Sequence, residues 1–149
     1  MIIVYNIPGK QAVDIITPRK ALYHGDPTLE MNDLNQQYNF IPARRKYRVH
    51  ALYPDPADLV QVGSRHIFFL QEPVHFIVTP RKPRVDLFLV SGDAIPRVPE
   101  LTAAFELHQI VFDSSVPNWK LVKWKKDCDS LQVPYYDVNE KGAFVMNLQ

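Results

Sequence analysis

The sequence predicts a single α/β domain in which helices pack on a layered, mixed β-sheet. Short runs of β-branched and aromatic residues, separated by proline and glycine, occupy the first half of the chain, and such runs are typical of β-strands. In the last third, strand-like runs alternate with segments of helical periodicity. A length of 149 residues suits one hydrophobic core, so we expect residues 1–149 to form one domain.

The chain opens with three short strand-like runs. Ile2–Tyr5 and Ala12–Ile16 flank the turn sequence Asn6–Gly9, so these two runs are expected to pair as a hairpin. Ala21–His24 is the third run, and the three together predict a β-meander.

The middle of the chain predicts one helix and then three strands. Leu29–Phe40 is polar with apolar residues at roughly helical spacing, and we expect Pro42 to end this helix. Turn-forming residues then separate three strand-like runs: Leu59–Val62, His66–Leu70 and Val74–Val78.

The last third predicts strands that alternate with helices. The expected strands are Val85–Ser91, Gln109–Phe112, Tyr135–Val138 and Ala143–Leu148. A helix at Pro99–Leu107 separates the first two strands, and a turn at Asn139–Gly142 joins the last two.

A second helix is expected between these pairs of strands. Ser114 and Ser115 can act as its N-caps, Pro117 suits its first turn, and Pro134 follows its end. Its apolar face repeats at three- and four-residue spacing: Leu121, Trp124, Cys128 and Leu131.

Charge and cysteine content narrow the classes of function. Seventeen basic against 16 acidic residues give a net charge of +1, so any affinity for nucleic acid must come from local basic clusters. The single cysteine, Cys128, excludes an intrachain disulfide and a multi-cysteine zinc site, and its expected burial leaves it without a catalytic role. No apolar run approaches the roughly 20 residues that span a bilayer, so the isolated domain is expected to be soluble.

Several segments resemble the C-terminal, non-membrane domain of ComEC-type competence proteins, in the version found in Bacteroidetes-type bacteria. They are Val4–Gly9, Tyr23–Asp26, Asp86–Asp93, Gln109–Lys120, Trp124–Cys128 and Tyr136–Met146. The resemblance implies a domain of a DNA-uptake protein whose partner is the membrane-embedded remainder of the same protein. It also implies association with the bacterial inner membrane through that parent, on the extracytoplasmic face.

The resemblance further implies a metallo-β-lactamase-like fold, but without its metal motif. In other members, a His-rich loop and a His-His-Gly-Ser-like segment gather two metals, and here the matching segment is Ser91–Ile95. The histidines are scattered singly: His24, His50, His66, His75 and His108. We therefore expect no bound metal, no cofactor and no catalytic residues. The alternative is a metal-dependent nuclease or phosphoesterase with unorthodox ligands from Asp26, Asp93, Asp113 and nearby histidines.

Two polar segments each follow the end of a predicted strand. If those strands are neighbours, the segments meet in the crevice where α/β sheets bind ligands, beside the start of a helix that favours anions such as phosphate. The candidate residues are Ser91, Gly92, Asp93, Asp113, Ser114, Ser115 and Asn118. The same residue types also serve as caps and turn formers, so both interpretations stay open.

Basic clusters with interleaved aromatic residues suggest contacts to DNA. Such clusters provide charge for phosphates and rings for bases in single-stranded nucleic-acid grooves. The first candidates are Trp119, Lys120, Lys123 and Lys126, and the second are Arg44, Arg45 and Lys46; a third basic cluster is Arg81–Arg84. Solvated helix faces and ordinary basic loops explain the same residues equally well.

These observations lead to one hypothesis and its rivals. We expect a noncatalytic C-terminal domain of a membrane DNA-uptake protein that binds or scaffolds DNA independently of its sequence. A metal-dependent hydrolase is the second possibility. A protein-interaction domain that never touches DNA is the third.

Overall fold

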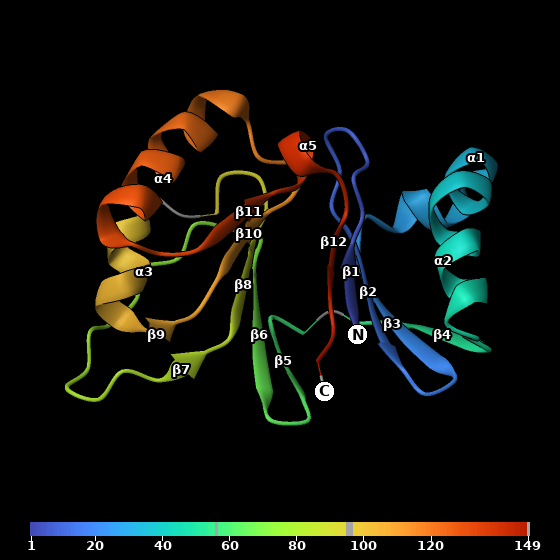
Figure 1. The fold of residues 1–149 in the computed structure, drawn as a ribbon, viewed down its shortest axis with the longest axis horizontal. Helices are drawn as coiled ribbons and strands as arrows, with labels where there is room; N and C mark the ends of the chain where they lie inside the picture. The colour runs from blue at the N-terminus through green and yellow to red at the C-terminus, as the bar shows by residue number, and fades with distance from the viewer. Residues whose placement is uncertain (56, 95–96, 149) are drawn as a thin grey trace.

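Two β-sheets pack face to face, and helices cover the outer side of each (Figure 1). The structure is a computed structural model that describes residues 1–55, 57–94 and 97–148. The predicted α/β class with layered sheets and packed helices is confirmed. The sequence led us to expect one mixed sheet, whereas the chain forms two five-stranded sheets and a small two-stranded one.

The first sheet contains the predicted N-terminal meander. Its strand order is β12-β1-β2-β3-β4, with β3 and β4 parallel and the other pairs antiparallel. The strands are β1 (Ile2–Val4), β2 (Ala12–Thr17), β3 (Lys20–Gly25), β4 (Ala51–Pro54) and β12 (Phe144–Met146). The first and last strands of the chain are thus neighbours at one end of this sheet.

The second sheet is mostly parallel. Its order is β11-β10-β8-β6-β5, and only β5 runs antiparallel to its neighbour. The strands are β5 (Leu59–Val62), β6 (Arg65–Leu70), β8 (Leu87–Val90), β10 (Ile110–Phe112) and β11 (Tyr135–Asp137). The short strands β7 (Arg84–Val85) and β9 (Glu106–Leu107) pair beside it.

The helices lie on the two outer sides. On the second sheet lie α3 (Val98–Ala104) and α4 (Asn118–Leu131), and α5 (Val138–Lys141) connects β11 to β12. The first sheet is covered by a nearly continuous helical segment made of η1 (Pro27–Met31), α1 (Asp33–Asn35), η2 (Gln36–Phe40) and α2 (Ile41–Lys46).

The described core consists of three apolar clusters, one between each pair of adjacent layers. Because side chains alternate along a strand, one strand contributes to two clusters. Val13 and Ile15 of β2 point into the space between the sheets, whereas Ala12 and Ile16 face α2. The inner strands β1, β8 and β10 are buried on both faces, which explains why they read as continuous apolar runs.

The predicted strand at Val74–Val78 is wrong. Residues 71–83 form no helix or strand. They cannot pair with the preceding strand β6, because β8 occupies one of its edges and β5 the other. Only Phe76 of this run packs on the core, against Phe68 and Phe105.

The predicted end of the first helix at Pro42 is also wrong. Pro42 lies in the first turn of α2, where its missing N–H is tolerated, and the helical course continues to Lys46. The spacing used for the prediction was misleading, because Leu34 and Tyr38 are exposed while Phe40 is fully buried.

Three predictions for the last third also need correction. The strands at the end of the chain form no hairpin, because β11 belongs to one sheet and β12 to the other, with α5 between them. The helix predicted at Pro99–Leu107 ends at Ala104, where the chain turns into β9. Ser114 and Ser115 do not cap α4, since Pro117 precedes this helix and no side chain bonds its first turn.

Candidate functional site

The two polar loops of the predicted crevice do meet. β8 and β10 are parallel neighbours, so the loops after them lie at the same edge of the sheet. The Ser91 hydroxyl donates a hydrogen bond to Asp113 Oδ2. Ser115 donates to Asp113 Oδ1 from its hydroxyl (2.5 Å) and its backbone N–H (2.9 Å), and its Oγ accepts from Gly92 N–H at 2.9 Å.

Asp113 is the buried centre of this cluster. Burial raises the pKa of its carboxyl to about 6, while the hydrogen bonds from Ser115 and Ser91 act in the opposite direction. A loop of the other sheet joins the cluster, because the Ser114 hydroxyl donates to Asn6 Oδ1 at 2.8 Å and Gly9 N–H donates to Ser114 O at 3.2 Å. The cluster therefore ties the two sheets together, and anion binding here stays a prediction.

The remaining crevice candidates lie toward the start of α4. Asp93 is exposed and forms an ion pair with the ammonium of Lys120. Asn118 is the first residue of α4 and is exposed. Ile95, which ends the segment matched to the family's metal motif, lies outside the described residues.

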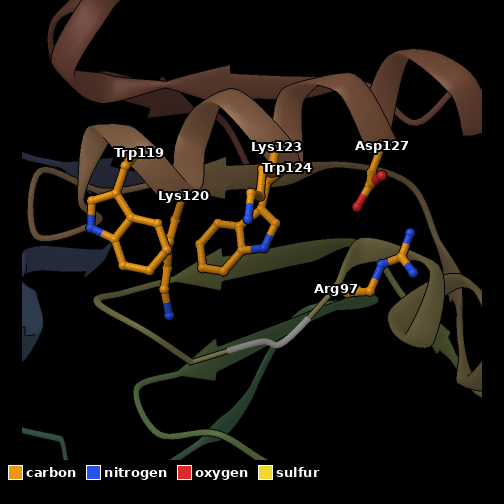
Figure 2. Close-up of a pocket in the computed structure, with 6 residues that line it drawn as sticks. All are labelled: Arg97, Trp119, Lys120, Lys123, Trp124 and Asp127. Atoms are coloured by element: carbon orange, nitrogen blue, oxygen red, sulfur yellow. The ribbon is translucent and has the colours of Figure 1, made fainter.

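A pocket of about 460 Å³ opens beside α4. Figure 2 shows Trp119, Lys120 and Trp124 extending from the helix, with Arg97 at the right of the view, below Asp127. Its lining residues are Arg97, Trp119, Lys120, Lys123, Trp124 and Asp127.

The two tryptophans of this pocket differ in exposure. Trp119 is 64% exposed, whereas Trp124 is 3% exposed and stacks on Phe112 in the core. The Lys120 ammonium lies 5.0 Å from the Trp119 ring centroid and 5.8 Å from that of Trp124. Trp119 therefore offers an open aromatic face next to a cation.

The lysines of α4 fall into two groups. Lys120 pairs with Asp93, and Lys125 pairs with Asp137 at 2.5 Å and Glu140 at 2.7 Å. Lys123 and Lys126 are exposed and form no ion pair within the described part of the chain. The structure thus brings Trp119, Lys120 and Lys123 together. It adds Arg97, which no sequence pattern selects, because only the packing of α3 on α4 places it here.

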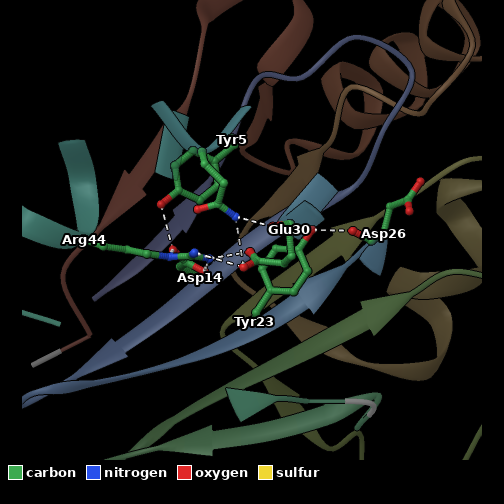
Figure 3. Close-up of polar contacts among 7 residues, drawn as sticks. Tyr5, Asp14, Tyr23, Asp26, Glu30 and Arg44 are labelled. Carbon is green, nitrogen blue, oxygen red and sulfur yellow. Dashed lines mark hydrogen bonds and ion pairs between the residues drawn. The ribbon is translucent and has the colours of Figure 1, made fainter. Parts of the chain in front are cut away.

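The second group of DNA candidates lies on the other outer side of the molecule. Arg44 donates to Asp14 at 2.8 and 2.9 Å and to Glu30 at 2.7 and 3.2 Å (Figure 3). Arg45 and Lys46 are exposed on α2. Because α2 covers the first sheet and α4 the second, the two basic groups cannot form one continuous surface (Figure 1).

The carboxylates considered as alternative metal ligands are not brought together. Asp26 pairs with Lys10 at 2.6 Å and accepts hydrogen bonds from Thr28, while Asp93 and Asp113 have the partners given above. Within residues 1–55, 57–94 and 97–148, no three His, Cys, Asp or Glu side chains are placed to hold a metal ion. Cys128 is buried, and burial raises the pKa of its thiol to about 12.

Comparison with models of known protein families gives a match over nearly the whole chain. A model of the ComEC C-terminal domain matches residues 2–148. The chain belongs to the ComEC C-terminal domain family. No curated protein and no solved structure matches it. Membership in this family assigns the domain to a competence-related DNA-uptake protein that is larger and membrane-associated.

The match to the ComEC family covers both sheets and every helix of the described structure. No helix in the described part of this ComEC domain has the length and apolar composition needed to cross a bilayer.

Proposed function

We propose that this ComEC C-terminal domain binds single-stranded DNA along α4 without cleaving it, and so assists transport by its membrane-embedded parent. The observation that carries the proposal is the exposed ring of Trp119 next to Lys120, in a pocket on α4 that Lys123 and Arg97 also line. Stacking of a base on an aromatic ring contributes about 1–3 kcal/mol and tolerates any sequence, as an uptake protein requires.

The electrostatic part of the binding is expected to be weak. The domain carries a net charge of only +1, and Lys120 is already neutralised by Asp93. Lys123, Lys126 and Arg97 remain to contact phosphates. A few such contacts give affinities of about micromolar or weaker, and the affinity falls as salt rises.

Fluorescence anisotropy with two unrelated single-stranded oligonucleotides, measured across a salt series, tests the proposal. Lys123→Gln/Lys126→Gln should weaken both complexes equally and reduce the salt slope by roughly 1.4, about 0.7 for each lost phosphate contact. Lys120 is left unchanged because its side chain is 14% exposed and paired with Asp93, so its replacement would also break this ion pair.

Arg45→Gln/Lys46→Gln is the matched control, since it removes two exposed cations from the opposite outer side. We expect it to leave affinity and slope unchanged. If only this control weakens binding, the DNA surface lies on α2 and the assignment to α4 is wrong. If the wild-type domain binds no DNA at low salt, the domain acts as a scaffold for proteins.

The noncatalytic part of the proposal rests on the residues themselves, since the sequence carries no His-x-His-x-Asp-His run and its histidines are scattered. Elemental analysis of the purified protein should find well below one zinc or manganese per chain. DNA should also survive incubation with Mg²⁺, Mn²⁺ or Zn²⁺. Stoichiometric metal together with DNA cleavage that a chelator abolishes would instead establish the metal-dependent nuclease.

Two further expectations belong to the same proposal. We propose that the layered fold is a form of the metallo-β-lactamase fold, which an experimental structure compared with that family would test.

We also propose that the domain lies on the extracytoplasmic face of the inner membrane. Protease digestion of spheroplasts expressing the tagged parent would degrade the domain if this is correct and spare it if the domain faces the cytoplasm.

A further inference from the structure

The segment between β6 and β7 leaves large apolar side chains in solvent. Ile77 is 86% exposed and Val78 is 63% exposed, while the preceding Phe76 packs against Phe105 with ring centroids 4.9 Å apart. The segment is therefore anchored at one residue and presents its neighbours outward. In Figure 1 it protrudes beyond β7 at the left of the view.

Cationic side chains follow these apolar residues within a few positions. Arg81, Lys82 and Arg84 line a second pocket of about 530 Å³ together with Thr79, Pro83 and Glu106. The Lys82 ammonium donates to Thr102 O at 2.7 Å, which holds the segment against α3, and Arg84 pairs at 2.9 Å with Asp86, two residues further along the chain. Arg81 is exposed and has no ion pair within the described part of the chain.

We infer that residues 74–84 dock this domain on the surface of a bilayer that carries anionic headgroups. Ile77 and Val78 enter the boundary between headgroups and acyl chains, and Arg81 with its neighbouring cations contacts lipid phosphates. Apolar area combined with basic residues is the combination that binds proteins at such interfaces. The parent is a membrane protein, so a bilayer lies close to the domain.

The charge of the segment favours a bilayer with anionic headgroups as its partner. Residues 74–84 contain three Lys or Arg residues and no Asp or Glu, so a surface of negative charge attracts the segment. The segment and the pocket on α4 are separate surfaces, since α4 begins at the top of Figure 1 and the segment protrudes at the lower left. Docking therefore leaves Trp119 accessible to DNA.

Flotation of the purified domain with vesicles tests this inference. Vesicles of phosphatidylethanolamine and phosphatidylglycerol should bind the domain at low salt, and vesicles of phosphatidylcholine alone should bind it several-fold less. Ile77→Ser/Val78→Ser should reduce binding to the anionic vesicles by roughly tenfold, because apolar burial is lost. Arg81→Gln should reduce it by roughly fivefold.

Two matched controls separate this segment from other exposed residues. Met31→Ser/Leu34→Ser removes two apolar side chains that are exposed on the other outer side of the molecule, and Arg45→Gln removes an exposed cation there. Both controls should bind vesicles like the wild type. Equal losses in a variant and its control, or no binding of the wild type to anionic vesicles, would overturn the inference.

A partner within the membrane-embedded part of the parent is the other outcome. In that case the isolated domain ignores vesicles, whereas Ile77→Ser/Val78→Ser weakens its association with the separately purified membrane part. This result also overturns lipid docking. DNA affinity measured by anisotropy should be unchanged in Ile77→Ser/Val78→Ser, so failure of the lipid inference and failure of DNA binding are distinguished.

Discussion

Arg44 and Asp14, thirty positions apart, are joined by two parallel hydrogen bonds. Arg44 Nε donates to Asp14 Oδ2 at 2.8 Å and Nη2 donates to Oδ1 at 2.9 Å. The Tyr5 hydroxyl donates to the same carboxylate at 2.8 Å, and burial, followed by the charge of Asp14, raises the pKa of Tyr5 well above its usual value. The fully buried Asp14 carboxylate therefore holds α2 against β2 of the first sheet.

We predict that Arg44→Ala destabilises the fold by about 3–5 kcal/mol, because it leaves the Asp14 carboxylate buried without its countercharge. Arg45→Ala, one position further on an exposed side chain, should change stability by less than about 0.5 kcal/mol. Urea unfolding followed by circular dichroism measures both. Similar stabilities for the two variants would show that the ion pair contributes little.

The buried carboxyl of Asp113 should give the protein an unusual pH dependence. Its pKa is raised from 3.8 to about 6 in the folded state, so the folded protein holds this proton more tightly than the unfolded chain. The unfolding free energy therefore falls as pH rises from about 4 to 6, by about 3 kcal/mol from this group.

Asp113→Asn isolates that contribution, because the other titrating groups are common to both proteins. The advantage of the wild type over this variant should shrink as pH rises from 4 to 7. Denaturant unfolding at several pH values measures the difference, and a difference that stays constant would place the carboxyl's pKa near its ordinary value.

Gly142 ends α5 with a φ of 86° and a ψ of −169°, a backbone conformation that is almost exclusive to glycine. No atom lies within 4 Å of the position that a Cβ would take, so the effect of a substitution is conformational. Gly142→Val should cost roughly 1–3 kcal/mol. Ala143→Val, at the exposed next position, should cost much less, and equal melting temperatures for the two variants would contradict the strain argument.

Trp119 should contribute to DNA binding through its ring and not through the fold. Trp119→Ala should weaken binding of single-stranded DNA by about 1–3 kcal/mol with little change in melting temperature, whereas Trp119→Phe retains most of the affinity. Tyr38→Ala removes another exposed aromatic ring on the opposite side and should leave affinity unchanged. Loss of affinity in Tyr38→Ala alone would move the DNA surface to η2.

Sequence patterns predicted a strand or helix correctly where its own apolar spacing and its flanking turn residues determine it. The hairpin of β1 and β2, the third strand of the meander and the amphipathic helix α4 were all predicted from apolar spacing and flanking turn residues. The polar residues after β8 and β10 were also correctly placed together, because parallel neighbouring strands end at one edge.

The tertiary structure alone decided which strands pair and which basic side chains remain exposed to solvent. Val74–Val78 has strand-like residues, but both edges of the preceding strand β6 are already paired with β5 and β8. The strands β11 and β12 enter different sheets, so pairing depends on segments that are distant in the sequence. Three basic side chains that look equivalent in the sequence also diverge. Arg44 is bound to Asp14 and Lys120 to Asp93, whereas Lys123 stays in solvent. Membership in the ComEC family could be inferred from the order of residues, but the pocket that Trp119 and Arg97 both line exists only because α3 packs against α4.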